Sequence, residues 1–404
     1  MYLRSRHLQR TLVRAVLLVL VVFTTVEVLH VRRYLALSQD QQRQQQNAPG
    51  RVFITGIFWN NEAILRETLS PVLLELVARL GPDNVYISIH ESGSWDGTKE
   101  ALDRLDADLE KRGVERTIST SNVTHADHIN NPDKSSGWVD TPKGTRELRR
   151  IPFLAKERNV ALQPLAELAA QGEHFDKVLF INDVVFSAND ALTLLNTNQG
   201  TYAAACSMDF KTPPSFYDTF ALRDAHGDEY LMPTWPYFRA AASRHAMQHH
   251  VPVPVKSCWN GMVAMSAAPF LAPASLRFRA LPDSLAASHL EASECCLIHA
   301  DNPLSAEKGV FVNPSVRVAY TRAAYEALAG VEARLSPLGV AVRLWENRVR
   351  RWTSTGRLKG KIVEKRVRAW SEEGKGKGEE RVEVGGFCLI NEMQVLREKG
   401  WAHV

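Results

Sequence analysis

Cysteine is scarce in this sequence, and the few cysteines are not spaced for metal binding. The chain has five cysteines in 404 residues, which are Cys206, Cys258, Cys295, Cys296 and Cys388. None forms a Cys-x-x-Cys pair, and no His/Cys spacing is typical of zinc, so a structural zinc site is excluded. Buried free thiols and, in an oxidising compartment, disulfides are the interpretations that remain. An internal repeat is also absent, which excludes a repeat architecture.

A strong net charge is absent as well. The formal net charge is +4, and residues 341–380 carry 12 Lys/Arg against 6 Asp/Glu, a net of +6, so the rest of the chain carries 4 − 6 = −2. The basic character therefore belongs to one segment and says little about the substrate. We interpret the segment as a solvated basic helix, with an anionic partner or a membrane surface as the alternative. We expect no nucleic-acid partner.

An apolar stretch without charge occupies residues 15–26, near the N-terminus. Its 12 residues are short for a transmembrane helix, which needs about 20. Arg14 and Glu27 lie at its ends, where they can snorkel and extend the span to residues 12–31. Arginines are slightly more frequent before the stretch than after it, which favours a cytosolic N-terminus. Because no small-residue cleavage site is evident, we expect a signal anchor rather than a removed signal peptide.

The composition after this stretch indicates how the chain is organised. Residues 37–50 are polar and rich in Gln, as expected of a flexible stem. We expect residues 1–36 to be a cytosolic tail and anchor, residues 51–330 a catalytic domain, and residues 331–404 a basic helical segment with a packing tail. Anchor, stem and globular domain together predict a type II membrane protein. The sequon Asn122-Val123-Thr124 agrees with a lumenal domain.

The order of elements in the globular part predicts an α/β fold with a mostly parallel, Rossmann-like sheet. We expect strands at residues 51–59, 84–90, 178–186 and 202–208, and helices at 60–80 with a break at Pro71, 99–112, 151–170 with a break near Pro164, and 189–195. The polar residues 119–147 predict a long surface loop.

The strand at residues 178–186 is the most informative element. It is apolar except for Asn182 and Asp183, and such a run is typical of a central strand covered on both faces. A carboxylate at the carboxyl end of such a strand lies where open α/β sheets bind ligands. Asp183 can hold a divalent cation there, and the cation can hold a diphosphate. The plain alternative is that Asp183 caps the strand or the following turn.

The loop at residues 91–98 offers a second polar group at the same edge. Its glycines permit a tight turn, and Thr98 is placed to cap the next helix. Glu91 and Asp96 bring carboxylates to the edge, where ribose or base donors meet them. A capped turn without a ligand is the alternative.

Strand, Glu-Ser-Gly-Ser-Trp-Asp-Gly-Thr and helix together resemble the signature of GT-A nucleotide-sugar glycosyltransferases. The Asn-Asn-Glu helix start at residues 60–62, Arg158-Asn159 and the acidic motif after the strand at 178–183 match in the same order. The resemblance implies a GT-A fold, and it implies that Arg158, Asn159 and Asn182 help to bind the donor. Asn182-Asp183-Val184-Val185 departs from the family's Asp-x-Asp motif.

A closer resemblance is to the fungal α-1,3-mannosyltransferase family linked to capsule and surface glycan synthesis, glycosyltransferase family 69. It covers about residues 50–325, and the segments that carry it are 90–98, 148–159, 175–186, 205–210, 217–224, 255–261 and 293–301, with an echo at 385–392. The resemblance implies GDP-mannose as donor, a mannose-containing glycan as acceptor, Mn²⁺ or Mg²⁺, retention of configuration and a Golgi membrane location with a lumenal catalytic domain.

The residues suggest a role for each part of such a site. Asp183 is the catalytic metal ligand, with Asp209 or His299 as further ligands, although a core histidine is the alternative for His299. Glu294 is the candidate acceptor-side carboxylate, against a structural ion pair with Arg277 or Arg279. Trp259 and Asn260 are placed to bind the acceptor sugar by stacking and hydrogen bonds. A core tryptophan beside a turn is the alternative.

Two other functions fit the same sequence. One is a transferase that uses another nucleotide sugar, because fold does not fix the donor. The other is a non-catalytic scaffold or glycan-binding subunit, which the incomplete Asp-x-Asp motif favours. The loop at residues 91–98 and Arg158-Asn159 argue against a scaffold, which needs neither.

Overall fold

The computed structural model describes residues 2–41, 50–141, 144–329, 335–354 and 356–404. Its strands are β1 (Val52–Phe58), β2 (Val85–Glu91), β3 (Glu115–Thr120), β4 (Trp138–Asp140), β5 (Arg146–Leu148), β6 (Lys177–Ile181), β7 (Ala204–Thr212), β8 (Ser215–Phe216), β9 (Arg223–Asp224), β10 (Val253–Ser257), β11 (Met262–Ser266), β12 (Val310–Ala319), β13 (Gln394–Arg397) and β14 (Gly400–His403).

One ten-stranded sheet organises the described part of the chain, in the order β3-β2-β1-β6-β11-β7-β12-β10-β9 with β8 paired to β7. The first four strands are parallel, and β11 runs antiparallel to both of its neighbours. Only β8, β10 and β11 run against the other seven strands. The predicted α/β class with a mostly parallel sheet is therefore confirmed.

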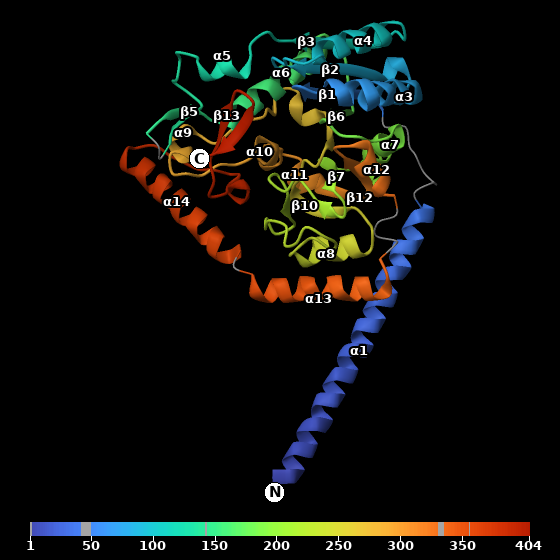
Figure 1. Ribbon diagram of the computed structural model, residues 1–404. Coiled ribbons are helices and arrows are strands. Elements are labelled where there is room, and N and C mark those ends of the chain that lie inside the picture. Colours follow the sequence, from blue (N-terminus) through green and yellow to red (C-terminus); the bar gives the residue numbers. More distant parts are fainter. Residues whose placement is uncertain (1, 42–49, 142–143, 330–334, 355) are drawn as a thin grey trace.

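The helices are α1 (Tyr2–Gln41), α2 (Glu62–Ile64), α3 (Ser70–Leu80), α4 (Thr98–Glu110), α5 (His125–Ile129), α6 (Arg150–Ala170), α7 (Ala188–Leu195), α8 (Ala241–Gln248), α9 (Asp283–Ala286), α10 (Glu294–Asp301), α11 (Ser305–Lys308), α12 (Arg322–Ala327), α13 (Pro337–Thr353) and α14 (Gly356–Gly376). Figure 1 shows α3 and α4 beside β1–β3, and α8, α13 and α14 around the opposite end of the domain.

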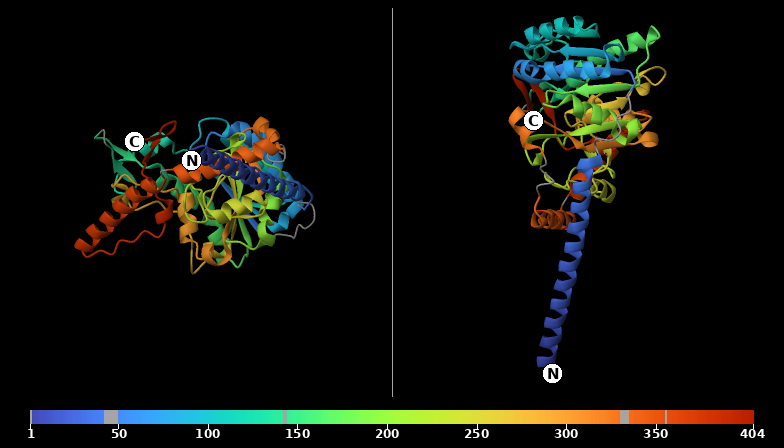
Figure 2. Two further views of the ribbon diagram at one scale, coloured as in Figure 1. Left: turned by 90° about the horizontal axis from the view of Figure 1, so that it is seen from below. Right: turned by 90° about the vertical axis from the view of Figure 1, so that its right-hand side faces the viewer.

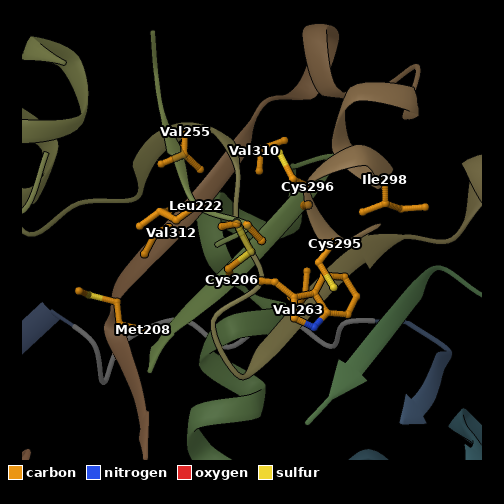
Figure 3. Packing of buried hydrophobic residues seen from close by; sticks show 14 of the residues in the cluster. Cys206, Met208, Leu222, Val255, Val263, Cys295, Cys296, Ile298, Val310 and Val312 are labelled. Atoms are coloured by element: carbon orange, nitrogen blue, oxygen red, sulfur yellow. A yellow bond between two sulfur atoms is a disulfide. The ribbon is translucent and has the colours of Figure 1, made fainter. Parts of the chain in front are cut away.

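Both faces of the sheet are covered, which explains the uninterrupted apolar sequence of β6. Leu179 and Ile181 belong to the core shared with α3, α4 and α7, whereas Val178 and Phe180 belong to the core shared with α6 and α10. Alternate residues of a strand point to opposite faces, so a strand between two cores needs an apolar residue at every position. Figure 3 shows part of the second core, where Cys295 lies near Val263 and Val312 lies near Leu222.

The helix predicted at residues 60–80 is interrupted as expected. A turn of π-helix over Leu65–Leu69 joins α2 to α3, and Pro71 lies in the first turn of α3. The π-helical turn, in which the Ser70 N–H bonds the Leu65 carbonyl, shifts the hydrogen-bond pattern just before Pro71, which has no N–H to donate.

Two local predictions were wrong. Pro164 does not break α6, which continues to Ala170. Ser88 and Thr55 of the sheet donate to the Ala161 carbonyl at 2.7 and 3.3 Å, so packing against the sheet supports the helix near the proline. Residues 119–147 are not one loop, since β3 adds the edge strand and α5, β4 and β5 follow it. The half-exposed sequence of β3 hid its strand character.

The apolar N-terminal stretch lies within α1, and Arg10–Leu35 is long and apolar enough to cross a membrane. Figure 1 shows α1 projecting from the domain, with the N-terminus far from the sheet. The first residues of the predicted stem, 37–41, continue this helix, and 42–49 lie outside the described residues.

Disulfides account for four of the cysteines. Cys206 of β7 pairs with Cys258, and Cys296 of α10 pairs with Cys388, while Cys295 is free and buried. The sequence left buried free thiols and disulfides open, and the structure contains both.

Candidate active site

The carboxyl ends of β1 and β2 are joined by a mutual set of hydrogen bonds between two loops. Asp96 accepts from the backbone N–H of Glu62 at 3.2 Å, and Glu62 accepts from the backbone N–H of Gly97 at 3.0 Å. The Thr98 hydroxyl accepts from the Asn61 N–H at 2.7 Å. The predicted capping role of Thr98 was wrong, because Gly97 is the N-cap of α4 and Thr98 is its first residue. The two loops that resemble the family signature therefore form one unit.

Glu91 and Asp96 differ in how much of their carboxylate is free. Glu91 is fully buried and accepts from the backbone N–H groups of Ser94 and Ser121. Asp96 also accepts from the N–H and the hydroxyl of Thr98, at 3.0 and 2.5 Å. Both side chains shape the loop, and Asp96 is the more open of the two.

Aromatic rings lie next to this pair of loops. Trp59 stacks on His125 with ring centroids 4.1 Å apart, and Trp95 meets the edge of Trp59 at 4.9 Å. Trp95 is exposed, with 58% of its surface accessible. Burial lowers the pKa of His125, so its ring is neutral near pH 7 and suited to stacking.

Asp183 follows β6 at the same edge and is only partly paired. Its Oδ2 accepts one side-chain hydrogen bond, from Asn61 Nδ2 at 3.3 Å. Burial raises the pKa of Asp183, and a hydrogen bond from its own backbone N–H, the bond from Asn61 and the charge of Arg158 oppose that rise. A partly enclosed carboxylate with so little compensation favours a cation as partner.

The tripeptide Trp259-Asn260-Gly261 holds the parts of the site together. Trp259 Nε1 donates to Asn182 Oδ1 at 3.3 Å, and the Gly261 carbonyl accepts from the Asn182 N–H at 2.9 Å. Gly261 has a φ of +86°, and a Cβ there would lie 2.6 Å from Val318, so only glycine fits. This tripeptide therefore fixes the residue that precedes Asp183.

Trp259 and Asn260 are 2% and 1% exposed, so neither presents an open face to a sugar. Trp259 packs instead beneath the guanidinium of Arg158, which lies 4.6 Å from its ring centroid. Asn260 Nδ2 donates to Asp209 Oδ1 at 3.0 Å and to the Asp218 carbonyl at 2.6 Å.

Arg158 and Glu294 form a buried ion pair. Arg158 Nε lies 3.0 Å from Glu294 Oε1, and the free thiol of Cys295 donates to the same oxygen at 3.2 Å. Burial raises the pKa of that thiol, so it stays protonated as a donor. Glu294 thus pairs with Arg158, whereas Arg279 pairs with Asp301 and Glu383. The alternative partners weighed from the sequence, Arg277 and Arg279, were wrong.

Asp209 is enclosed by donors. Besides Asn260, the Tyr320 hydroxyl donates to its Oδ2 at 2.7 Å and the Asp218 N–H to its Oδ1 at 3.3 Å. Burial, and then the nearby charge of Asp218, raise the pKa of Asp209 to about 7. The pKa of Asp218 is also raised, chiefly by burial, with Arg150 and Arg158 opposing the rise.

His299 lies in a different environment from Asp183 and Asp209. Its Nε2 is 2.7 Å from the Cys258 carbonyl, and its ring reaches the sulfurs of Cys206 and Cys258 within 4.8 Å. Those sulfurs are joined in a disulfide and are not thiolate ligands. Burial lowers the pKa of His299 to about 4. His299 is therefore a core histidine, which was the alternative to a metal ligand.

Asn159 is committed to the backbone. Its amide donates to the Phe278 carbonyl at 2.8 Å and accepts from the Phe278 N–H at 2.9 Å. Asn159 and Lys156 also line a cavity of about 610 Å³ beside residues 278–283, and neither Asp183 nor Asp209 lines it. The donor-binding role that the resemblance implied for Asn159 has no contact in support here.

The sequence did not identify Asp218, Tyr320 or Asn61 as site residues. Asp218 and Asn61 lie inside segments that carried the family resemblance. A polar side chain in such a segment was the one sign in the sequence that these residues could belong to the site. Tyr320 had no signal, because it contacts Asp209 only through the pairing of β7 with β12.

Of the predicted metal ligands, Asp183 accepts one side-chain hydrogen bond, whereas Asp209 accepts three hydrogen bonds in all. Within the described residues, no three carboxylates converge closely enough to hold a metal ion. Asp209 already accepts three hydrogen bonds, and a metal there would have to displace them. A cation on Asp183 would take its remaining ligands from a bound diphosphate and water, as Mg²⁺ and similar ions commonly do.

The order of the sheet and the joined acidic loops at its carboxyl edge define the GT-A type of α/β fold, as predicted. The family model described as Cryptococcal mannosyltransferase 1 matches residues 51–301, and the chain belongs to this family.

Over 312 residues the chain is 28% identical to the α-1,3-mannosyltransferase CMT1 of Cryptococcus neoformans var. neoformans serotype D. The match covers 72% of this chain and 60% of that relative, so the chain spans well under its full length.

Solved structures are more distant. The mannosyltransferase PcManGT of Pyrobaculum calidifontis, in complex with GDP-Man and Mn²⁺, is 12% identical with a TM-score of 0.35, over 88% of this chain and 86% of that one. TarS of S. aureus is 13% identical with a TM-score of 0.36, over 75% and 44%. At these scores the likeness supports no argument about chemistry.

Proposed function

We propose that the chain transfers mannose from GDP-mannose to a mannose-containing glycan, forming an α-1,3 linkage with retention of configuration. The observation that carries the proposal is the position of Asp183, a partly buried and weakly paired carboxylate at the end of a central strand. It lies in a chain of a mannosyltransferase family.

The residues of this edge divide the work of donor binding. Asp183 holds Mn²⁺ or Mg²⁺, and the bound cation supplies positive charge to the leaving diphosphate. Asn61 orients the carboxylate, and Asn182 is fixed beside it by Trp259. Asp96 and the exposed ring of Trp95 meet the nucleoside. Arg158 contributes through its field, because its guanidinium is already occupied by Glu294 and Trp259.

Retention has two routes, and the environment of Glu294 supports one of them. A nucleophile on the opposite face of the sugar needs a free carboxylate, whereas Glu294 is buried and held by Arg158 and Cys295. In the other route the acceptor hydroxyl attacks the anomeric carbon on the face that the diphosphate leaves. The bond to the phosphate oxygen breaks, and that oxygen takes the hydroxyl proton. We propose this second route, with Glu294 as a positioning residue.

The same proposal places the domain in the Golgi lumen, anchored by α1 as a type II membrane protein. Two disulfides are compatible with an oxidising compartment and uncommon in the cytosol.

The test uses the full chain in nanodiscs. GDP binding is titrated with and without MnCl₂, and GDP-mannose is compared with UDP-galactose and UDP-N-acetylglucosamine on a mannobiose acceptor. We expect metal-dependent GDP binding, GDP-mannose as the preferred donor and an α-anomeric product by NMR. A folded chain that binds no GDP would instead be a scaffold, and preference for a UDP-sugar would assign another donor.

A further inference from the structure

Helix α13 has apolar residues on two opposite faces. One face, with Val340, Leu344 and Asn347, is buried against the domain. The other carries Leu338, Val342, Val349 and Trp352, which are 73%, 55%, 48% and 70% exposed. At 3.6 residues per turn these four lie within an arc of about 80°. A surface helix needs one apolar face for its own domain, so the second face calls for a second partner.

The outward face of α13 lies beside the anchor helix. Trp345 Nε1 donates to Thr24 Oγ1 at 3.0 Å, and Arg348 pairs with Glu27 at 2.6 Å. Figure 1 shows α13 crossing the direction of α1 at the end of the domain from which α1 projects, and Figure 2 shows α13 almost end-on beside α1. A helix crossing a membrane anchor in this way runs along the membrane surface.

The depth of the contact agrees with that arrangement. Thr24 and Glu27 lie within the apolar span Arg10–Leu35. With a rise of 1.5 Å per residue, they are about 12–17 Å from its Leu35 end. Val28, Val31 and Leu35, which follow them in α1, are buried in the core of the domain, so the contact lies where the lipid-accessible part of α1 meets the domain. The ion pair with Arg348 also neutralises Glu27, the acidic residue inside the span.

The charges around α13 suit a phospholipid surface. The helix carries Arg343, Arg348, Arg350 and Arg351 against the single acid Glu346. Beside it, Arg244, Arg348 and Arg351 line a cavity of about 450 Å³ together with Glu27 and His245. Among the described residues, Arg244 and Arg351 have no carboxylate within ion-pair distance and donate instead to the Arg239 carbonyl and to Asn347 Oδ1.

We propose that α13 is a membrane-interface helix, with its outward apolar face at the acyl boundary and its arginines on headgroup phosphates. This inference rests on the proposed anchoring by α1. The catalytic domain then contacts the bilayer through both α1 and α13, which restricts its orientation relative to the membrane. A basic amphipathic helix with an interfacial tryptophan has the composition that such a position requires.

The test measures the depth of Trp352 in the full chain, reconstituted in nanodiscs of phosphatidylcholine and phosphatidylserine. Lipids brominated near the headgroup quench tryptophans at the acyl boundary, and aqueous acrylamide quenches exposed ones. We expect Trp352→Phe to remove part of the emission that bromolipid quenches. The matched control is Trp401→Phe, since Trp401 is 43% exposed on β14, and it should remove only emission that acrylamide quenches.

A second variant tests the apolar face itself. Val342→Asp with Val349→Asp puts charge on the outward face without touching Val340 or Leu344. We expect it to stay in the membrane through α1, to keep its transfer activity on a soluble acceptor, and to lose the bromolipid quenching of Trp352. Arg350→Gln with Arg351→Gln should weaken that quenching more in bilayers with phosphatidylserine than in phosphatidylcholine alone.

The outcomes separate this inference from the proposed function. Wild-type protein that resists carbonate extraction but has Trp352 quenched only by acrylamide would overturn the role of α13 alone. Extraction of the wild type by carbonate would overturn both the anchor and α13. Loss of donor binding with unchanged bromolipid quenching would overturn the proposed reaction and leave α13 at the interface.

Discussion

The two halves of the sheet end in polar groups of different kinds. In the parallel half, β3-β2-β1-β6, the acids of one loop accept from backbone N–H groups of the next, as Asp96 and Glu62 do. In the mixed half, around β7 and β12, side chains bind one another, as Asp209, Asn260 and Tyr320 do. Glu62 and Asp96 are 34 residues apart in sequence, whereas Arg158 and Glu294 are 136 apart.

The difference shows what each half contributes. Bonds to backbone fix the shape of a loop and leave part of a carboxylate free for a ligand. A network of buried side chains is closed to a ligand, but it holds the strands that carry the site in place. We therefore propose that the donor-binding groups lie at the parallel half and that the mixed half supports them.

The largest effect should follow from breaking the support. Glu294→Ala leaves the guanidinium of Arg158 buried without its partner, so we expect a loss of about 3–5 kcal/mol in the free energy of unfolding. Chemical denaturation measures it. Glu373→Ala removes an acid from an exposed pair with Lys377 and should leave the unfolding midpoint unchanged. Equal stability of the two variants would contradict a supporting role for Glu294.

Asp183→Asn tests the binding side at nearly constant shape. Without the charge that holds the cation, the leaving diphosphate loses stabilisation, and we expect kcat to fall by roughly 10²–10³-fold. Initial rates with GDP-mannose and MnCl₂ measure this, and the melting temperature should hardly change. The charge-matched control is Asp103→Asn, on the exposed face of α4. Full activity of Asp183→Asn would move the metal elsewhere.

Asp96→Ala should affect both binding and stability, because Asp96 also holds two loops. It removes hydrogen bonds from the Glu62 N–H and from Thr98, at a cost of about 1–2 kcal/mol. GDP affinity, measured by calorimetry at a temperature where the variant is folded, should fall in addition. If affinity is unchanged while stability falls, the loop is only a turn.

The smallest effect concerns pH and the mixed half. The pKa of Asp209 is raised from its ordinary value of 3.8 to about 7, so folding favours its protonated form. The wild type therefore loses stability as pH rises from about 4 to about 7, and none further above that. Asp209→Asn does not ionise, so its melting temperature relative to the wild type should rise by a few degrees over this range. A difference that is independent of pH would mean that Asp209 is ionised throughout.

What the sequence predicted follows the same division. The start of the strand predicted at 178–186, the helix start at 60–62 and the loop at 91–98 depend on neighbours in sequence and on apolar runs, and they were predicted correctly. The end of that strand was wrong, because β6 stops at Ile181. Arg158 contacts both Trp259 and Glu294, and these contacts depend on how β11, α6 and α10 pack. No local pattern records such packing, which is why Trp259 and Glu294 were assigned to the acceptor, with a core tryptophan and an ion pair of Glu294 with Arg277 or Arg279 as the alternatives. Asp183 and Asp209 looked alike in the sequence as acids ending buried strands, and the structure distinguishes them by the three donors around Asp209, which are Asn260, Tyr320 and the Asp218 N–H.

The disulfide between Cys296 and Cys388 has a consequence for how the protein is made. Cys388 and its neighbour Phe387 also give their carbonyls to the buried guanidinium of Arg223, and Ile390 pairs with Glu291. A growing chain presents these partners only after the sheet has been synthesised, so the helix that carries Glu294 cannot reach its final state before residue 390 is available. Until then Cys296 lacks its disulfide partner and Arg223 lacks two of its carbonyl acceptors, so we expect the domain to complete its folding only after its C-terminal residues have been made.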